Sequence, residues 1–262
     1  MITPIAVLGA GPIADRFAKN SDVVVTEPDS AAVVIHLTAD ADEVVTQLRA
    51  GRDVVTALAL RALPVDEVRA ACRAGGSTLH ATGGFGSAVA ARLTRSLAAA
   101  AREITRIELI EEIDVPGDPV FPWNTVSEDT LPAFYADALK VLHEAAFGDE
   151  PIESPSVAIT DSGALHTLGD RTAYRSIRTH GAAAVPLRYR LIIATAAGTS
   201  TATVDFHPTD ALHPADHLTY RELLTAIGPI QAAAPGIARR DLAITYLRAD
   251  DRLSAPSPGH RG

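Results

Sequence analysis

The sequence predicts a two-domain α/β protein, in which an inserted α+β domain interrupts a parallel-sheet domain. Short β-branched runs alternate with helical segments from residue 5 to residue 101, a pattern typical of βαβ units. Longer alternating runs surround one apolar helix between residues 106 and 206, which indicates a mixed or antiparallel sheet. With 262 residues, the chain can bury two cores. We expect residues 1–104 and 214–262 to form the first domain and residues 105–213 the second.

The expected elements follow from local patterns. In the first domain, strands are expected at Ile5–Leu8, Val23–Thr26, Ala32–Leu37, Val54–Ala57 and Ser77–Ala81. Helices are expected at Pro12–Lys19, Ala41–Ala50, Pro64–Ala74 and Ala88–Ala101, with Gly51 and Gly75-Gly76 as stop signals. The second domain is expected to hold strands at Arg106–Ile113, Leu187–Ala194 and Thr201–Phe206 and a helix at Leu131–Phe147, and a helix at Tyr220–Ala233 follows it.

A glycine-rich turn joins the first strand to the first helix. Residues 9–14 read G-A-G-P-I-A, the G-x-G-x-x-A pattern. Gly9 permits the tight turn, Gly11 lets a phosphate approach bare backbone, and a small residue at Ala14 allows close packing. Pro12 suits the first helical turn, where its missing N–H costs nothing. The first domain is therefore expected to be Rossmann-like, with a dinucleotide held at Gly9, Gly11, Pro12 and Ile13.

Composition excludes several classes of partner. A net charge of −9 and a pI near 5.4 argue against nucleic acid. No apolar stretch approaches the ~20 residues of a membrane span, and no leader-like segment precedes the first strand. The lone Cys72 suits a reducing compartment and is expected to be buried and inert. We therefore expect a cytoplasmic protein that acts on a small molecule.

Three further segments, in this order, resemble known enzymes. Residues 79–93, LHATGGFGSAVAARL, are similar to the T-G-x-N-P-G-F segment of amine dehydrogenases. Residues 107–114, IELIEEID, stand where dihydrodipicolinate reductases carry E-A-H-H, and residues 226–237, AIGPIQAAAPGI, resemble their N-A-I-P…A-A-P-P-G helix and turn. With the glycine turn, these segments span most of the chain. The chain resembles a divergent, shortened member of the dihydrodipicolinate reductase and native amine dehydrogenase (2,4-diaminopentanoate dehydrogenase-like) family.

The resemblance implies a function and a second contact with a cofactor. Members of the family use NAD or NADP, so an oxidoreductase acting on an imine, amine or related carbonyl compound is expected. The amine dehydrogenase segment meets the nicotinamide end of the cofactor, which assigns Thr82, Gly83, Gly84 and Phe85 to that contact. A plain turn is the alternative for these glycines. The resemblance also implies a homodimer through the sheet of the second domain.

Three departures from the family bear on the expected function and leave an alternative open. The reductases' histidine pair is replaced by Ile113 and Asp114, and the stretch 58–62, LALRA, lacks the amine dehydrogenases' catalytic Glu. Only about twenty residues separate Gly11 from the strand Ala32–Leu37, whereas a full βαβ unit needs about 30. The alternative is a repurposed member without redox turnover, catalysing a cyclisation, isomerisation or elimination in specialised metabolism, or a protein that only binds.

Glu27 is the candidate for recognising the adenosine ribose. It follows the strand Val23–Thr26, eighteen residues after Gly9. A carboxylate there would bind the 2′-hydroxyl and repel a 2′-phosphate, favouring NADH over NADPH. Beside Pro28 and Asp29, an acid of a surface turn is the alternative, and the sequence slightly favours it.

Four side chains are candidates for catalysis. Glu111 and Glu112 point to opposite faces of one strand, so one of them should face the cleft between the domains, as a general acid or an ammonium-binding group. His80 at a strand end and His213 before the last helix are alternates. Acids at such positions more often lie on the exposed surface of a strand, and a lone histidine more often makes a structural hydrogen bond.

Two further groups have weaker signals. The segment 207–217, HPTDALHPADH, offers imidazole and carboxylate groups, but nothing fixes a coordination geometry, and an ordinary turn with a helix cap is the favoured interpretation. No metal is therefore expected. Phe121, Trp123 and Tyr135 can wall an apolar pocket, or belong to the core or a dimer interface.

Overall fold

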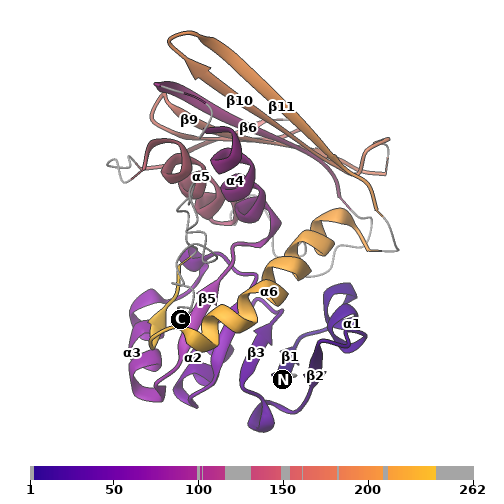
Figure 1. Cartoon of the computed structure of the whole chain (residues 1–262), viewed down its shortest axis with the longest axis vertical. Coiled ribbons are helices and arrows are strands. Elements are labelled where there is room, and N and C mark those ends of the chain that lie inside the picture. The colour runs from indigo at the N-terminus through magenta and orange to yellow at the C-terminus, as the bar shows by residue number, and fades with distance from the viewer. Residues whose placement is uncertain are drawn as a thin grey trace, which may run out of the picture.

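The computed structural model describes residues 3–98, 101, 103–115, 131–148, 154–160, 162–181, 183–208 and 212–239. Two six-stranded sheets dominate these residues, and helices lie between and around them (Figure 1). The lower sheet in this view is parallel throughout, and the upper sheet is mixed. The predicted fold class, a Rossmann-like parallel sheet combined with a second mixed sheet, is confirmed.

The first sheet has the strand order β12-β5-β4-β3-β1-β2. Its strands are β1 (Thr3–Leu8), β2 (Val23–Val25), β3 (Val33–His36), β4 (Asp53–Thr56), β5 (Thr78–Ala81) and β12 (Gly236–Ile237). Helices α1 (Pro12–Ala18) and α6 (Pro214–Ala232) pack on one face, and α2 (Ala41–Arg49) and α3 (Val65–Gly75) on the other. The chain leaves this sheet after β5 and returns to it only at β12.

Local chemistry explains where the helices of this sheet begin and end. The Asp40 side chain caps α2 by accepting hydrogen bonds from the backbone N–H groups of residues 42 and 43. Gly76 ends α3 in the left-handed conformation, with φ +64°. The Nδ1 atom of His213 accepts from the N–H of Ala215 and so caps α6, which therefore begins at Pro214 rather than at the predicted Tyr220.

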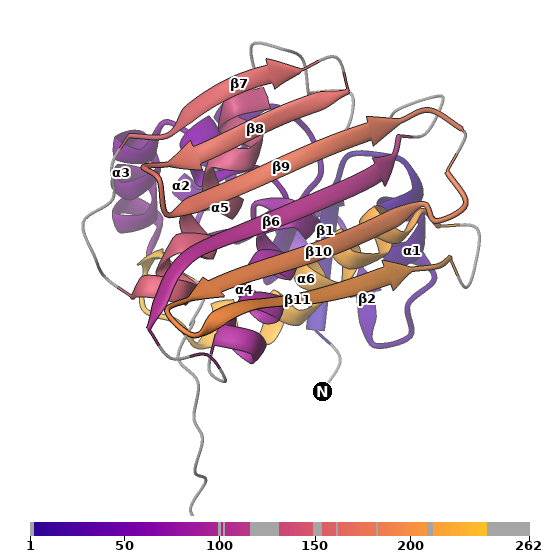
Figure 2. The ribbon, with the colours of Figure 1, turned by 90° about the horizontal axis from the view of Figure 1, so that it is seen from above.

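The second sheet has the order β11-β10-β6-β9-β8-β7, in which only β6 and β9 run parallel. Its strands are β6 (Ile104–Asp114), β7 (Ser156–Thr160), β8 (Gly163–Leu168), β9 (Thr172–Thr179), β10 (Leu187–Thr195) and β11 (Gly198–Phe206). Helices α4 (Gly84–Ala98) and α5 (Leu131–Phe147) cover its inner face, and no described helix covers its outer face (Figure 2). The main apolar core lies between this sheet and the two helices.

Three differences from the predicted elements have physical causes. The strands β7, β8 and β9 were not predicted, because polar residues such as His166 and Ser176 occupy inward positions and break the apolar alternation. Helix α4 starts at Gly84, four residues before the predicted start, because the Gly83-Gly84 turn leads directly into it. Between β2 and β3 only a short 3-10 turn, Pro28–Ser30, replaces a helix, which confirms the predicted compression.

Among the described residues, no helix is long and apolar enough to cross a membrane. Cys72 is buried on α3, as predicted, and burial raises the pKa of its thiol.

Candidate functional site

The glycine turn lies where the direction of the first sheet's connections reverses. From β1 the chain moves through α1 to β2 on one side, whereas β3, β4 and β5 follow on the other side of β1. Ligands of open α/β sheets bind at such a switch point, beyond the carboxyl ends of the strands. Gly9 and Gly11 stand at the carboxyl end of β1, directly at this point.

The glycines are required by their surroundings. Gly9 has φ +125°, and a Cβ atom there would lie 2.7 Å from the carbonyl oxygen of Leu37, just after β3. Gly11 has φ +108° and caps α1, with Pro12 in the first turn. Ile13 is 3% exposed and anchors α1 to the core. The backbone of the turn is therefore held against the sheet, with Gly9 and Ala10 exposed.

The same turn fits a pyrophosphate. Gly9 and Pro12 are exposed, and Gly11 is half-buried, so an anion can reach the backbone N–H groups at the start of α1. Because α1 has only seven residues, its dipole is short, and bare backbone rather than a long helix would supply most of the attraction. Glu27 is exposed and follows the carboxyl end of β2, the strand beside β1. That is the position from which a carboxylate can reach the ribose next to the pyrophosphate.

A second glycine turn follows β5. The backbone N–H of Gly83 donates to Leu58 O at 3.3 Å, and the N–H of Gly84 donates to Thr82 Oγ1 at 3.1 Å. Both glycines have positive φ, at +66° and +67°. Phe85, 1% exposed, enters the core of the second sheet. The turn thus joins the carboxyl edges of β4 and β5 to the start of α4.

Two buried hydroxyl groups flank this turn without hydrogen-bond partners among the described residues. Ser87 Oγ would lie 2.5 Å from a Cβ atom at Gly83, and Thr219 Oγ1 would lie 3.9 Å from one at Gly84. The two residues are 1% and 0% exposed. Buried hydroxyls normally find partners, so their free hydrogen-bonding capacity suits a polar group of a ligand, such as a carboxamide.

Asp137 brings a carboxyl group to the same turn and was not singled out by the sequence. It lies on α5, and its Oδ2 atom accepts a hydrogen bond from the N–H of Leu60 at 2.6 Å. Its Cβ atom would be 3.5 Å from a Cβ at Gly83. Burial raises the pKa of Asp137, while the Leu60 N–H, Arg61 and Lys140 oppose the shift. The side chain therefore stands beside the stretch 58–62 that lacks a carboxylate of its own.

Glu111 lies inside the second core rather than at this turn. It is 0% exposed, and its Oε2 atom accepts from the hydroxyls of Tyr174 at 2.7 Å and Tyr189 at 2.5 Å. Its Oε1 atom accepts from Tyr135 at 2.6 Å and from Ser176 at 3.3 Å. Burial first, and then the Glu111 charge, raises the pKa of all three phenols. Each phenol therefore stays protonated and donates to the carboxylate.

The other three catalytic candidates also occupy defined contacts. Glu112 points to the outer face of the sheet and accepts from Arg190 at 2.9 Å, so the two glutamates lie on opposite faces as predicted. The Nδ1 atom of His80 lies 3.0 Å from the carbonyl of Ala238, beyond β12. His213 caps α6, and burial lowers its pKa while Asp114 opposes the shift. These are contacts within the fold, and a catalytic role for the three residues stays a prediction.

The remaining predictions concern metal and apolar residues. The described residues hold no group of three or more His, Cys, Asp or Glu side chains that could bind a metal ion. Asp210, within the segment 207–217, lies outside the described residues, as do Phe121 and Trp123. Tyr135 is a core residue, 1% exposed, and donates to Glu111.

No protein-family model and no curated protein sequence matches the chain. Solved structures do match over nearly full length. The amine dehydrogenase from Mycobacterium smegmatis has a TM-score of 0.63 at 13% identity, covering 90% of this chain and 94% of that chain. A probable dehydrogenase from Thermotoga maritima has a TM-score of 0.60 at 11% identity, covering 89% and 90%. GenD2 from gentamicin A biosynthesis, solved in complex with NAD, has a TM-score of 0.56 at 16% identity, covering 89% of each chain. The chain therefore has the fold of these dehydrogenases.

Proposed function

We propose that the protein is an NAD(P)-dependent oxidoreductase that acts on an imine, amine or related carbonyl group of a small molecule. One observation carries the proposal: the Gly9–Gly11 turn, whose two glycines have positive φ, lies at the switch point of a dehydrogenase fold. Because a Cβ atom at Gly9 would meet Leu37 O at 2.7 Å, the turn is held close to β3, where a pyrophosphate would lie.

The residues present suit the two ends of a dinucleotide. Gly9, Gly11, Pro12 and Ile13 would hold the pyrophosphate, and Glu27 the adenosine ribose, favouring NADH. The turn at residues 82–85 would meet the nicotinamide end, where the unpartnered hydroxyls of Ser87 and Thr219 can bind its carboxamide. A bound nicotinamide supplies or accepts a hydride.

Asp137 is the proposed acid of the site. Reduction of a C=N or C=O group takes up a proton as well as a hydride. Because burial raises its pKa, the Asp137 carboxyl group keeps a proton to higher pH than an ordinary aspartic acid, which suits it to deliver that proton to the nitrogen or oxygen of the substrate. The Leu60 N–H fixes Oδ2, which leaves Oδ1 to face a substrate. In the reverse direction, the carboxylate accepts the proton.

Titration with NADH and NADPH is the first test of the proposal. A cofactor at 100 times its dissociation constant should stabilise the fold by about 2.7 kcal/mol, which a thermal melt and nicotinamide fluorescence both detect. Binding in the micromolar range supports the proposal and justifies a screen of amines with NAD(P)⁺ and of ketones and 2-oxo acids with ammonia and NAD(P)H. If neither cofactor binds at millimolar concentration, the proposal of an NAD(P)-dependent oxidoreductase is wrong.

The role of Asp137 has its own test once a substrate is found. Asp137→Asn keeps an acceptor for the Leu60 N–H but carries no transferable proton. We expect kcat to fall at least about 100-fold, with unchanged affinity for NADH. Asp66→Asn, on the exposed surface of α3, is the matched control and should leave kcat intact. Equal activity of the two variants would remove Asp137 from the reaction.

A second candidate function rests on the compressed adenosine side. Strand β2 has three residues and is followed by a 3-10 turn instead of a helix, so less protein is available to bind adenosine. This observation favours a repurposed enzyme that performs a cyclisation, isomerisation or elimination without a cofactor, or a protein that only binds. A protein that ignores both nicotinamide cofactors but is stabilised by a small organic ligand would meet this description.

We also propose that the protein works as a cytoplasmic homodimer through the outer face of the second sheet. That face has no described helix over it (Figure 2) and displays half-buried Ile110, Ile177 and Ile192. The same strands also carry three ion pairs, so both positive and negative side chains are present: Arg175 with Glu108, Arg188 with Asp205, and Arg190 with Glu112. Such a surface can pair with a second copy of itself about a two-fold axis. Light scattering after gel filtration should give about twice the chain mass of 27.4 kDa.

A further inference from the structure

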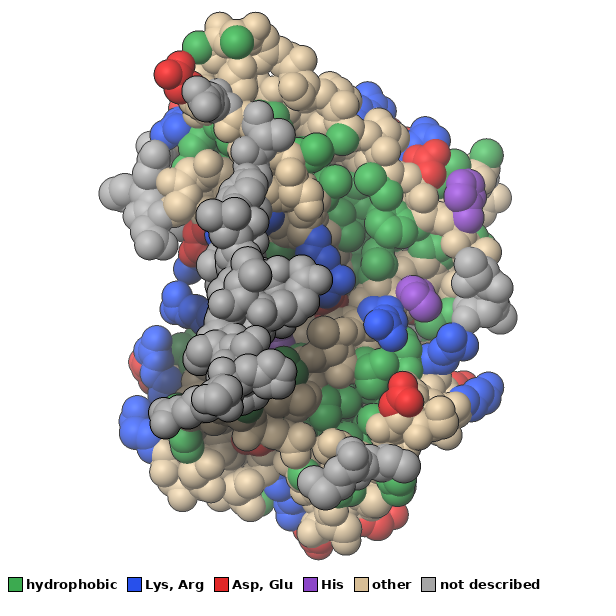
Figure 3. Space-filling model, viewed as in Figure 1, with side chains coloured by type: hydrophobic (Ala, Val, Ile, Leu, Met, Phe, Trp, Pro, Cys, Tyr) green, Lys and Arg blue, Asp and Glu red, His purple; other side chains and the backbone are tan. Residues whose placement is uncertain are grey.

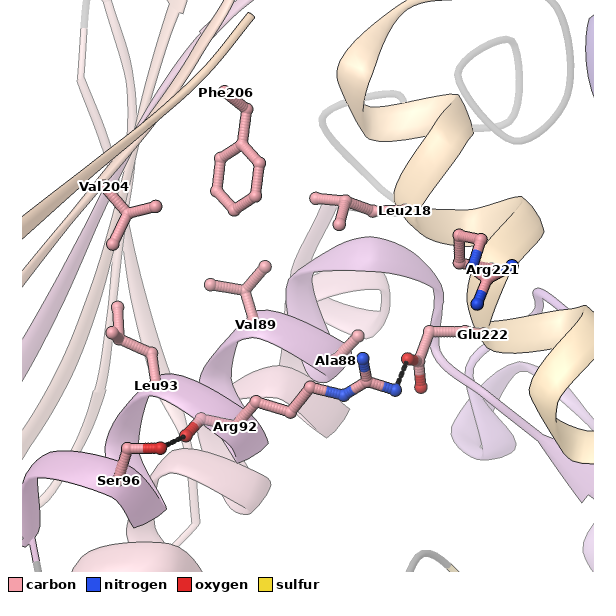
Figure 4. Close-up of a pocket in the computed structure, with 10 residues that line it drawn as sticks. All are labelled: Ala88, Val89, Arg92, Leu93, Ser96, Val204, Phe206, Leu218, Arg221 and Glu222. Atoms are coloured by element: carbon pink, nitrogen blue, oxygen red, sulfur yellow. Dashed lines mark hydrogen bonds and ion pairs between the residues drawn. The ribbon is translucent and has the colours of Figure 1, made fainter.

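A pocket of about 340 Å³ lies where α4, α6 and β11 meet (Figure 4). Its size falls at the lower end of the ~300–1,000 Å³ range of small-molecule sites. Strand β11 belongs to the second sheet, and α6 packs on the first sheet. The residues that line it are Ala88, Val89, Arg92, Leu93, Ser96, Val204, Phe206, Leu218, Arg221 and Glu222.

The pocket is separate from the proposed active site. Helix α4 turns Gly86 toward α5, where a Cβ atom would lie 3.8 Å from Ala138 Cβ, next to Asp137. Ala88, Arg92 and Ser96 recur at a spacing of four on α4 and line the pocket together with Val89 and Leu93 of the same helix. Neither Asp137 nor any residue of the turn at 82–85 lines the pocket, so the pocket and the proposed active site have no residue in common.

Most of the pocket wall is apolar. Val89 and Leu93 from α4, Val204 and Phe206 from β11, and Leu218 from α6 project into one space in Figure 4. Figure 3 shows hydrophobic side chains gathered on this face between the second sheet and α6, with basic side chains beside them. Burying an apolar ligand against this wall would remove apolar surface from water, which favours binding.

The charged end of the pocket has an excess of one positive charge. Arg92 pairs with Glu222 through its Nη2 atom, as Figure 4 marks. The Glu222 side chain is 7% exposed, whereas that of Arg92 is 64% exposed, so the ion pair fixes the guanidinium and leaves much of it open. Arg221 is exposed and makes no side-chain hydrogen bond or ion pair with any residue that the structure describes. Two cations and one anion thus meet at one end of an apolar pocket.

We propose that this pocket binds a small monocarboxylate with an apolar tail. The tail would lie against the wall formed by α4 and β11, and the carboxylate would accept hydrogen bonds from Arg221 and from the open side of Arg92. Guanidinium groups match the two oxygens of a carboxylate. The single excess charge favours a monoanion over a phosphate ester, which carries about −1.5 to −2 at pH 7. A ligand held there contacts both β11 and α6, so it links the two sheets without entering the proposed active site.

Calorimetric titration of the full chain with a matched set of probes tests this proposal. Octanoate, octanamide, acetate and octyl phosphate differ in charge, tail and head group. We expect octanoate to bind with one ligand per chain and a negative heat-capacity change, the mark of apolar burial. Octanamide should bind about ten-fold more weakly because it lacks the charge, and acetate should not bind because it lacks the tail. Tighter binding of octyl phosphate than of octanoate would overturn the choice of a monoanion.

Two variants locate the site. Arg221→Gln removes an exposed cation, so the fold should survive, and octanoate affinity should fall about ten-fold while octanamide affinity stays the same. Val204→Trp should fill the pocket and abolish binding of both. Arg49→Gln, an exposed residue in the last turn of α2, is the matched control and should bind as the wild type does. Octanoate that fails to bind at millimolar concentration, or binds equally to Val204→Trp, overturns the proposal.

Discussion

Removing one hydroxyl from the buried Glu111 cluster should measure how strongly the phenols hold that carboxylate. Tyr189→Phe deletes the 2.5 Å hydrogen bond to Glu111 Oε2 and leaves a ring of nearly the same volume. Hydrogen bonds to charged groups contribute about 1.5–3 kcal/mol, and the site is 0% exposed, so solvent cannot replace the lost donor. We expect the free energy of unfolding to fall by about 2 kcal/mol and the melting temperature by about 4–8 °C.

A double-mutant cycle separates the charge from the packing. In the Glu111→Gln background the acceptor is neutral, so Tyr189→Phe should cost only about 1 kcal/mol, which leaves a coupling energy of about 1 kcal/mol. The assay is urea unfolding followed by far-UV circular dichroism at pH 7. Tyr220→Phe, which loses a neutral hydrogen bond from Asn20 between α1 and β2, is the matched control and should show no coupling to Glu111. A cost below about 0.5 kcal/mol in both backgrounds would refute the charge-assisted role of Tyr189.

Three further predictions use other regions. Burial lowers the pKa of His166 to about 4, so as the pH falls the unfolded chain takes up a proton near pH 6.5, before the folded chain does. The contribution of neutral His166 to the free energy of unfolding should be complete above pH 6.5 and fall by about 3 kcal/mol toward pH 4. Urea unfolding of His166→Gln should show a smaller fall. Gly9→Ala, which places a Cβ 2.7 Å from Leu37 O at φ +125°, should cost more than about 1 kcal/mol and weaken NADH binding in fluorescence titrations at least ten-fold, whereas Gly76→Ala should spare NADH binding. Glu27→Ala should shift the NADH-to-NADPH affinity ratio toward NADPH by about ten-fold; an unchanged ratio would place Glu27 outside the cofactor site.

Much of the first sheet was predictable because its signals are local. Gly9, Gly11 and Pro12 encode a strand-turn-helix within ten residues, and the β-branched runs at β3 and β4 are buried strands in both sequence and structure. The compression between β2 and β3 was visible as a simple count of residues. The opposite faces of Glu111 and Glu112 followed from the alternation of a strand.

The second sheet was harder to predict because its inward positions are not uniformly apolar. His166, Tyr174 and Ser176 point inward on β8 and β9, and they are stable there only because Glu111 and Tyr135 supply hydrogen-bond partners or packing from other elements. A local sequence pattern contains no information about these partners, because they lie far away in the sequence. The polar residues therefore looked like loop, although in the fold they form part of a core.

The sequence by itself determined the class of fold, the glycine turn and the spacing that brings Glu27 to the end of β2. Only the tertiary structure decided which carboxyl group stands beside the second glycine turn. Asp137 meets Leu60 across 77 positions of sequence, and its environment comes from α5, the turn after β4 and the turn after β5. Local propensity acts within a few residues, whereas burial, pKa and hydrogen-bond satisfaction depend on neighbours that the folded chain brings together.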